Sequence, residues 1–137
     1  MKESTYIMLK PDALERNLTG EIISRIERIG YRIRDCKMMQ LNEAVLREHY
    51  VHLTDKPFFQ EILDYMMRGP VLGMIVEGEN AVTGMRKLMG ATKFQDSLPG
   101  TIRGDFSTST SENLIHGSDS HENAAIEIRR FFGTGSF

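Results

Sequence analysis

The amino-acid sequence predicts an α/β fold in which a four-stranded sheet carries helices on one face. Four short runs rich in apolar residues have the length and composition of strands, and the segments between them repeat apolar residues at helical spacing. The resulting order is β, α, β, α, α, β, α, a long loop, β, α, which favours helices packed on one sheet. The 137 residues contain no repeat or linker, so we expect a single domain over residues 1–137.

The second predicted strand differs from the others in its pattern. Cys36 and Met38 alternate with polar neighbours and would form one apolar face, whereas Ile33 is out of phase. We therefore expect a β-bulge near Ile33. The strands are expected at residues 5–9, at 31–41, at 71–76 and around Ile115.

Helix boundaries are predicted from capping residues and helix breakers. A loop without clear periodicity is expected at 91–112, and ordered loops of this length are usually functional. Residues 133–137 are expected to form a short mobile tail. The predicted helices cover 20–29 before Gly30, 42–52 with Asn42 as N-cap, 57–67 opened by Pro57, 80–89 with Asn80 as cap, and a last helix opened by the capping-box spacing of Asp119 and Glu122.

Composition excludes several classes of protein. The net charge is −2, so no general basic excess is present to hold a nucleic-acid backbone. Cys36 is the one cysteine, which rules out an internal disulfide and favours a reducing, cytoplasmic location. No apolar run approaches the ~20 residues that span a bilayer, so no membrane association is expected.

The motif most suggestive of chemistry is Asn-Leu-Ile-His-Gly-Ser-Asp-Ser at residues 113–120. It places His116 between a strand and the start of a helix. A lone histidine is more often an ordinary core or loop residue, but imidazole can also act as nucleophile or base near neutral pH. Four strand residues cover about 13 Å and seven helical residues about 10 Å, so a returning helix brings Glu127 level with His116. Spacing alone favours Glu127 as a solvated helix residue over a partner of His116.

Alternative chemistries find little support in the sequence. His116, Ser118 and Glu127 could form a hydrolase triad, but the G-x-S-x-G elbow is absent. Walker and protein-kinase motifs are absent too, so side chains would have to hold any phosphates. His49 and His52 lack a third metal ligand and are interpreted as helix-surface residues. Candidate phosphate ligands are Lys10, Arg86 and Arg103, although a residue of this type taken alone is more often a surface charge.

The motif at 113–120 closely resembles the active-site signature of nucleoside diphosphate kinases. Blocks similar to this family recur along the chain from about Ser4 to Phe132, and the resemblance implies the family's fold, an α/β (α+β) sandwich with a ferredoxin-like βαββαβ core. These blocks are Met-Leu-Lys-Pro-Asp-Ala at 8–13, Glu-His-Tyr at 48–50, Lys-Pro-Phe-Phe at 56–59, Gly-Pro-Val at 69–71, Glu-Gly at 77–78 and Pro-Gly-Thr-Ile-Arg-Gly-Asp-Phe at 99–106.

The resemblance also implies a role for each matching residue. It makes the protein an enzyme that moves the γ-phosphate from a nucleoside triphosphate to a nucleoside diphosphate through a phosphohistidine. Mg²⁺ would be carried on the nucleotide phosphates rather than in a protein cage. The implied roles are nucleophile for His116, positioning of its ring for Glu127 and Ser118, phosphate binding for Lys10, Arg86, Thr92 and Arg103, sugar binding for Asn113, a wall residue at Tyr50 and base stacking for Phe58.

One departure from the family pattern and two rival functions remain open. The family commonly has a proline two residues after the position of Thr92, where this chain has Phe94, so we expect a looser loop, with either reduced subunit stability or altered subunit packing but no loss of chemistry. The family also implies a homo-oligomer, with a hexamer favoured over a tetramer. The rivals are an inactive nucleotide-binding scaffold and a histidine phosphocarrier that passes phosphate to a protein.

Overall fold

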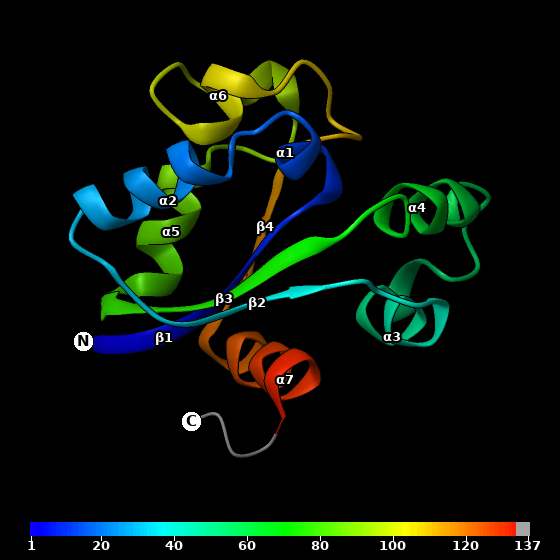
Figure 1. Ribbon diagram of the computed structural model, residues 1–137, viewed down its shortest axis with the longest axis horizontal. Coiled ribbons are helices and arrows are strands. Elements are labelled where there is room, and N and C mark those ends of the chain that lie inside the picture. Colours follow the sequence, from blue (N-terminus) through cyan, green and yellow to red (C-terminus); the bar gives the residue numbers. More distant parts are fainter. Residues whose placement is uncertain (134–137) are drawn as a thin grey trace.

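The computed structural model describes residues 1–133 and contains the predicted four-stranded sheet (Figure 1). The strand order is β2-β3-β1-β4, and every neighbouring pair is antiparallel. Residues 134–137 of the predicted tail lie outside the described part of the chain. The strands are β1 (Lys2–Leu9), β2 (Arg32–Met39), β3 (Val71–Glu79) and β4 (Ile115–Gly117).

Two crossover helices join these strands in the order β1-α2-β2-β3-α5-β4, which is the ferredoxin-like βαββαβ arrangement. The remaining helices are insertions into or additions to this core. No helix within residues 1–133 has the length and apolar character needed to cross a membrane. The helices are α1 (Pro11–Glu15), α2 (Thr19–Arg28), α3 (Glu43–His49), η1 (Val51–Leu53), α4 (Phe59–Met66), α5 (Ala81–Met89), η2 (Phe94–Asp96), α6 (Ile102–Phe106) and α7 (His121–Phe132).

Helices cover both faces of the sheet, so the prediction of helices on one face is wrong. The cause lies in β1, whose residues Tyr6, Ile7, Met8 and Leu9 are all buried although neighbours point to opposite faces. Ile7 and Leu9 pack in one core with residues of α2 and α5, and Tyr6 and Met8 pack in a second core with residues of α3, α4 and α7. Figure 1 shows α2 and α5 on one side of the sheet and α7 on the other.

Strand β2 forms one edge of the sheet. Its pairing with β3 shifts register between Ile33 and Asp35, which confirms the predicted bulge. The apolar face expected from Cys36 and Met38 is not buried, since both side chains are exposed. An edge strand has a neighbour on one side only, so alternation alone does not determine which of its residues are covered.

The loop predicted at 91–112 contains two short helices that periodicity did not reveal, η2 and α6. Helix α6 begins after Thr101, whose hydroxyl accepts a hydrogen bond from the Gly104 amide at 2.9 Å. The Phe94 amide donates to Thr110 Oγ1 at 3.0 Å and so ties the two ends of this loop together. A proline at position 94 could not form that bond.

The predicted helix caps are partly confirmed. Asn42 caps α3 by accepting from the Val45 amide at 2.9 Å. Helix α7 is capped by Ser120, which accepts from the Asn123 amide at 3.1 Å, so the prediction that placed the cap at Asp119 is wrong by one residue. Asn80 precedes α5 in a left-handed conformation and makes no side-chain cap.

Candidate active site

A cavity of about 440 Å³ collects most of the predicted site residues on one face of the molecule. A second cavity, of about 570 Å³, shares Lys10, Tyr50, Thr92 and Asn113 with it and adds Phe58, whose ring is 44% exposed. The two cavities therefore adjoin along these shared residues, with His116 in the first and Phe58 in the second. The predicted residues that line the first cavity are Lys10, Tyr50, Arg86, Thr92, Arg103, Asn113, His116 and Glu127.

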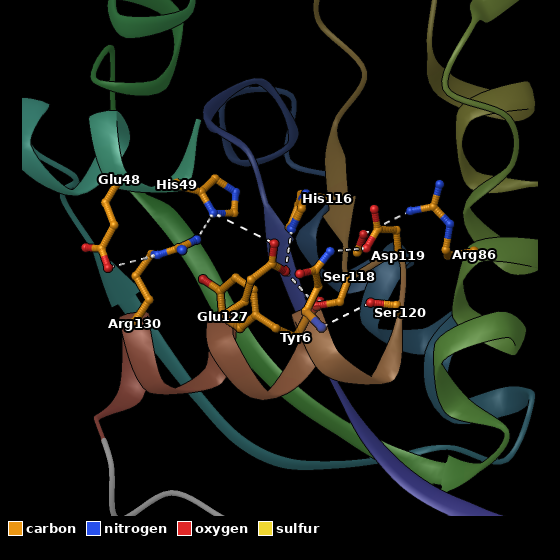
Figure 2. Close-up of polar contacts among 12 residues, drawn as sticks. Tyr6, Glu48, His49, Arg86, His116, Ser118, Asp119, Ser120, Glu127 and Arg130 are labelled. Carbon is orange, nitrogen blue, oxygen red and sulfur yellow. Dashed lines mark hydrogen bonds and ion pairs between the residues drawn. The ribbon is translucent and has the colours of Figure 1, made fainter. Parts of the chain in front are cut away.

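His116 and Glu127 meet as the spacing predicted (Figure 2). His116 stands on β4 opposite Met8 of β1, and α7 crosses this face of the sheet. The distance from His116 Nε2 to Glu127 Oε1 is 2.8 Å. The same carboxylate oxygen accepts a hydrogen bond from Ser118 Oγ at 2.6 Å. Ser118 is itself buried, with its amide donating to the Tyr6 carbonyl.

These contacts determine the state of the imidazole. Burial alone would raise the pKa of the Glu127 carboxyl, but hydrogen bonds from His116 and Ser118 lower it below its usual value. An ionised carboxylate only accepts hydrogen bonds, so His116 Nε2 carries the proton. Nδ1 of a neutral ring then holds a free lone pair. The arrangement thus provides a nucleophilic nitrogen on a ring whose orientation is fixed.

A strained turn precedes β4. The Ile115 amide donates to the Asn113 carbonyl at 2.8 Å, and Leu114 between them has φ +75°, which together define a γ-turn of the rarer kind. Strand alternation predicts that Leu114 shares a face with His116, but the turn places it in the opposite core with Ile7 and Ile115. That expectation is wrong because strand alternation does not extend through a residue at positive φ.

Arg103 is held by the carbonyl groups of this turn. The guanidinium donates to the backbone oxygens of Asn113 at 3.3 Å, Gly90 at 2.9 Å and Ile115 at 2.6 Å. Burial and the nearby Arg86 lower the pKa of Arg103 to about 10, so the group stays charged at neutral pH. A guanidinium has five N–H donors, and two remain after these bonds. Arg103 is therefore a rigid cation with donors left for an anion.

Lys10 and Arg86 add charge to the same cavity. Lys10 Nζ donates to Asn113 Oδ1 at 2.9 Å, and burial together with Arg103 lowers the pKa of Lys10 to about 8. Arg86 Nη1 donates to the Gly117 carbonyl at 3.0 Å. With Arg130, four cationic side chains line one cavity in a protein of net charge −2, and Lys10, Arg86 and Arg103 give it the pattern of a local anion site.

The prediction for His49 is corrected by the structure. His49 was assigned to a helix surface, yet its side chain is only 2% exposed and its ring lies 4.8 Å from the His116 ring. After His116, a Cβ at Gly117 would lie 2.6 Å from Met89 Sδ, so this glycine permits close packing of α5 on β4.

Sequence reasoning also missed residues that line the cavity. Arg130 of α7 contacts His49, and Glu48 lies beside Arg130. Asp119 stands at the start of α7, where Asn123 donates to it. The spacing of His49 within α3 carried no signal of its burial, because α7, which covers it, is about 80 residues away in the sequence.

Comparison with known proteins agrees with this geometry. A sequence model of the family described as nucleoside diphosphate kinase matches residues 3–137. The chain belongs to the nucleoside diphosphate kinase family. A nucleoside diphosphate kinase of Exiguobacterium sibiricum is 52% identical over 130 residues, which cover 95% of this chain and 94% of that protein.

Solved structures of nucleoside diphosphate kinases also share the fold. That of Encephalitozoon cuniculi has a TM-score of 0.95 and 45% identity, covering 98% of this chain and 92% of that one. The enzyme of Halobacterium salinarum, solved in complex with CDP, has a TM-score of 0.93 and 42% identity, covering 98% and 90%. The ferredoxin-like α/β fold is therefore the fold of nucleoside diphosphate kinases.

The donor set of the cavity bears on which metal it could hold. Mg²⁺ prefers oxygen ligands and usually binds through one or two carboxylates and substrate phosphates. Among residues 1–133 the one cluster with metal-ligand spacing is His49, His116 and Glu127, whose two nitrogens suit Mg²⁺ poorly. Asp119 and Glu48 supply single carboxylates at the cavity wall. The residues present therefore fit a Mg²⁺ ion that arrives with nucleotide phosphates.

Proposed function

We propose that this chain, as a single domain, transfers the γ-phosphate of a nucleoside triphosphate to a nucleoside diphosphate through a phosphohistidine at His116. The observation that carries the proposal is the hydrogen bond between His116 Nε2 and Glu127, which leaves Nδ1 free beside three cations. Family membership supports the reaction type.

In the first half-reaction, the lone pair of His116 Nδ1 attacks the γ-phosphorus. The P–Nδ1 bond forms while the bond to the bridging oxygen breaks, and the diphosphate leaves with that electron pair. In the second half-reaction a terminal oxygen of another diphosphate attacks the same phosphorus, and the electron pair of the P–N bond returns to Nδ1. The proton stays on Nε2, hydrogen-bonded to the Glu127 carboxylate, throughout, so no proton has to move in either step.

The cationic side chains lower the barrier by stabilising charge on the transferring group. Arg103 is already held in place by three carbonyl groups, so it needs little reorganisation during the reaction. Lys10 and Arg86 contribute charge from β1 and α5, and Thr92 offers a hydroxyl. Mg²⁺ on the nucleotide, held in part by Asp119, would neutralise phosphate charge and fix the phosphate conformation.

Recognition of the nucleoside is assigned to the second cavity. The exposed ring of Phe58 at its wall can stack on any base, because every base has a π-face. Asn113 lies between the two cavities and is the residue we assign to the sugar hydroxyl. Tyr50 forms part of the wall on both sides, and burial raises its pKa to about 12, so its hydroxyl keeps its proton.

The proposal extends to assembly and location. We assign the chain to a homo-oligomer, with a hexamer favoured over a tetramer, and to the cytoplasm. Exposed Ile29 and Leu98 line an apolar cavity of about 620 Å³ that a neighbouring subunit could cover. The exposed thiol of Cys36 is compatible with a reducing compartment. Light scattering on a sizing column distinguishes a hexamer from a tetramer.

The reaction is tested by following labelled phosphate. The protein is incubated with γ-labelled ATP and Mg²⁺, freed of nucleotide, and then given GDP. The proposal predicts acid-labile label on the protein that moves to GTP. Absence of label would leave the scaffold function, and label that never moves to a diphosphate would favour the phosphocarrier.

A further inference from the structure

His49 occupies a position between two charged residues of α7. Its side chain projects from the end of α3 and is almost fully buried against the rings of Tyr50, His116 and Phe131. Figure 2 shows it beside His116, with Arg130 and Glu127 approaching from the helix below. The proposed mechanism gives this buried imidazole no part, and its contacts indicate what it does.

The ring of His49 acts as a hydrogen-bond acceptor. Arg130 Nη1 lies 2.7 Å from His49 Nδ1, and a guanidinium can only donate, so Nδ1 carries a lone pair. Burial and the neighbouring His116 lower the pKa of His49 to about 3, which keeps the ring neutral at physiological pH. Arg130 is held on its other side by Glu48, with 3.5 Å between Nε and Oε1.

The same nitrogen lies close to the carboxylate that orients His116. The distance from His49 Nδ1 to Glu127 Oε2 is 3.9 Å. Glu127 and Arg130 are three residues apart on α7, a spacing at which an acid and an arginine ordinarily pair. Within residues 1–133, Glu127 instead bonds His116 and Ser118, and Arg130 bonds His49 and pairs with Glu48.

We propose that His49 is a positioning residue that binds Arg130 and thereby keeps its guanidinium away from Glu127. Without this acceptor, Arg130 would turn toward Glu127 and form the stronger charge-assisted pair. The carboxylate would then no longer hold the Nε2 proton of His116, and both ring orientation and tautomer would be lost. The inference rests on the proposed function, because the affected ring is the proposed nucleophile.

The test uses a pair of substitutions on the full chain. His49→Leu removes the acceptor at similar volume, and we expect the rate of His116 phosphorylation by ATP to fall roughly 10- to 100-fold, as for loss of a charge-assisted hydrogen bond. Adding Arg130→Met removes the competing cation, so the double variant should recover most of the rate. His49→Gln keeps an acceptor and should lose much less. Arg129→Met in the His49→Leu background is the matched control and should rescue nothing.

Nitrogen NMR of the His116 ring provides a readout that does not depend on activity. The wild type and the His49→Leu/Arg130→Met double variant should show the proton on Nε2, and His49→Leu alone should show a mixture of tautomers. Thermal melts confirm that each variant is folded. A His49→Leu variant with wild-type rate and tautomer, or a defect that Arg130→Met leaves unchanged, would overturn the inference. Failure of the wild type to take up label would overturn the proposed function instead, while the NMR comparison still decides the role of His49.

Discussion

His116 of β4 and Glu127 of α7 are joined by a hydrogen bond of 2.8 Å between Nε2 and Oε1. This contact fixes which nitrogen of His116 faces the nucleotide cavity. The chemistry that we assign to the cavity follows from it, since the ring cannot present Nδ1 reproducibly unless Nε2 is held.

Replacing Glu127 by Gln should slow phosphorylation of His116 without unfolding the protein. The amide keeps the shape of the side chain but removes the charge that orients the Nε2 proton. A hydrogen bond to a charged group contributes about 1.5–3 kcal/mol, so we expect a rate about 10- to 100-fold lower in single-turnover rapid-quench experiments. Ser118→Ala removes the other donor to Glu127 and should have a smaller effect. A Glu127→Gln rate within twofold of the wild type would contradict the assigned role.

Nucleotide binding should weaken as pH rises above neutrality. Burial and Arg103 lower the pKa of Lys10 to about 8, so in the free enzyme this charge is present below pH 8 and lost above it. We expect the Kd for ADP, measured by calorimetry, to increase between pH 7 and pH 9. A Lys10→Met variant should bind weakly and with little dependence on pH in this range. An equal slope in both proteins would show that another group titrates.

The lowered pKa of Lys10 should also make the folded protein more stable as pH rises, whereas it makes nucleotide binding weaker. Between about pH 8 and pH 10.5 the unfolded chain keeps the Lys10 proton and the folded chain has lost it. Stability therefore rises with pH wherever the unfolded state binds more protons. The destabilising contribution of charged Lys10 is fully present below pH 8 and is relieved above it. Comparison of urea unfolding for the wild type and Lys10→Met across this range isolates the effect.

Loss of the hydroxyl group should raise the free energy of unfolding at Tyr6 and lower it at Tyr65. Tyr6 Oη is buried and has no hydrogen-bond partner in the described part of the chain, whereas Tyr65 Oη donates to the buried Asp12 at 2.5 Å. Tyr6→Phe removes an unsatisfied group and should stabilise the fold by about 1 kcal/mol, and Tyr65→Phe should destabilise it by about 1–3 kcal/mol. Denaturant unfolding of both variants measures the difference. Equal destabilisation would show that Tyr6 Oη has a partner.

The Lys93-Phe94 departure stays a prediction, and the Thr110 contact shows how to test it. Phe94→Pro would restrict the unfolded chain, which typically raises the free energy of unfolding by about 0.4–1 kcal/mol. It would also remove the hydrogen bond that the backbone amide of residue 94 donates to Thr110 Oγ1. In a Thr110→Val background that bond is already absent. Phe94→Pro should therefore raise the Tm more in Thr110→Val than in the wild type. No change in Tm or in assembly size in either background would refute the idea of a loosened loop.

Local patterns predicted the parts of the fold that neighbouring residues determine. The four strands, the bulge near Ile33 and the Asn42 cap depend on residues close in sequence, and each is present. The approach of Glu127 to His116 could also be predicted, because a strand, a turn and a returning helix follow one another directly in the sequence. Residue type alone identified Lys10, Arg86 and Arg103 as candidate phosphate ligands, and the roles of Tyr50, Phe58, Thr92 and Asn113 depended on resemblance to the family.

What the sequence did not show depends on packing between distant segments. His49 is buried only because α7 packs over it. The side chain of Leu114 points to the opposite face because of a strained turn, and no pattern in the neighbouring residues predicts that turn. Coverage of both sheet faces follows from the second half of β1, where Tyr6, Ile7, Met8 and Leu9 are all buried. Helix α6 has only five residues, which is too short for periodicity to reveal.

The most direct test of the account is the position of the phosphoryl group on the protein. The protein is phosphorylated with ATP and Mg²⁺, and the phosphohistidine is identified by alkaline hydrolysis with separation of the two isomers and by ³¹P NMR. Because Glu127 holds Nε2, we predict phosphate on Nδ1 of His116, with none on a His116→Ala variant. Phosphate on Nε2, or label that persists in His116→Ala, would contradict the central claim.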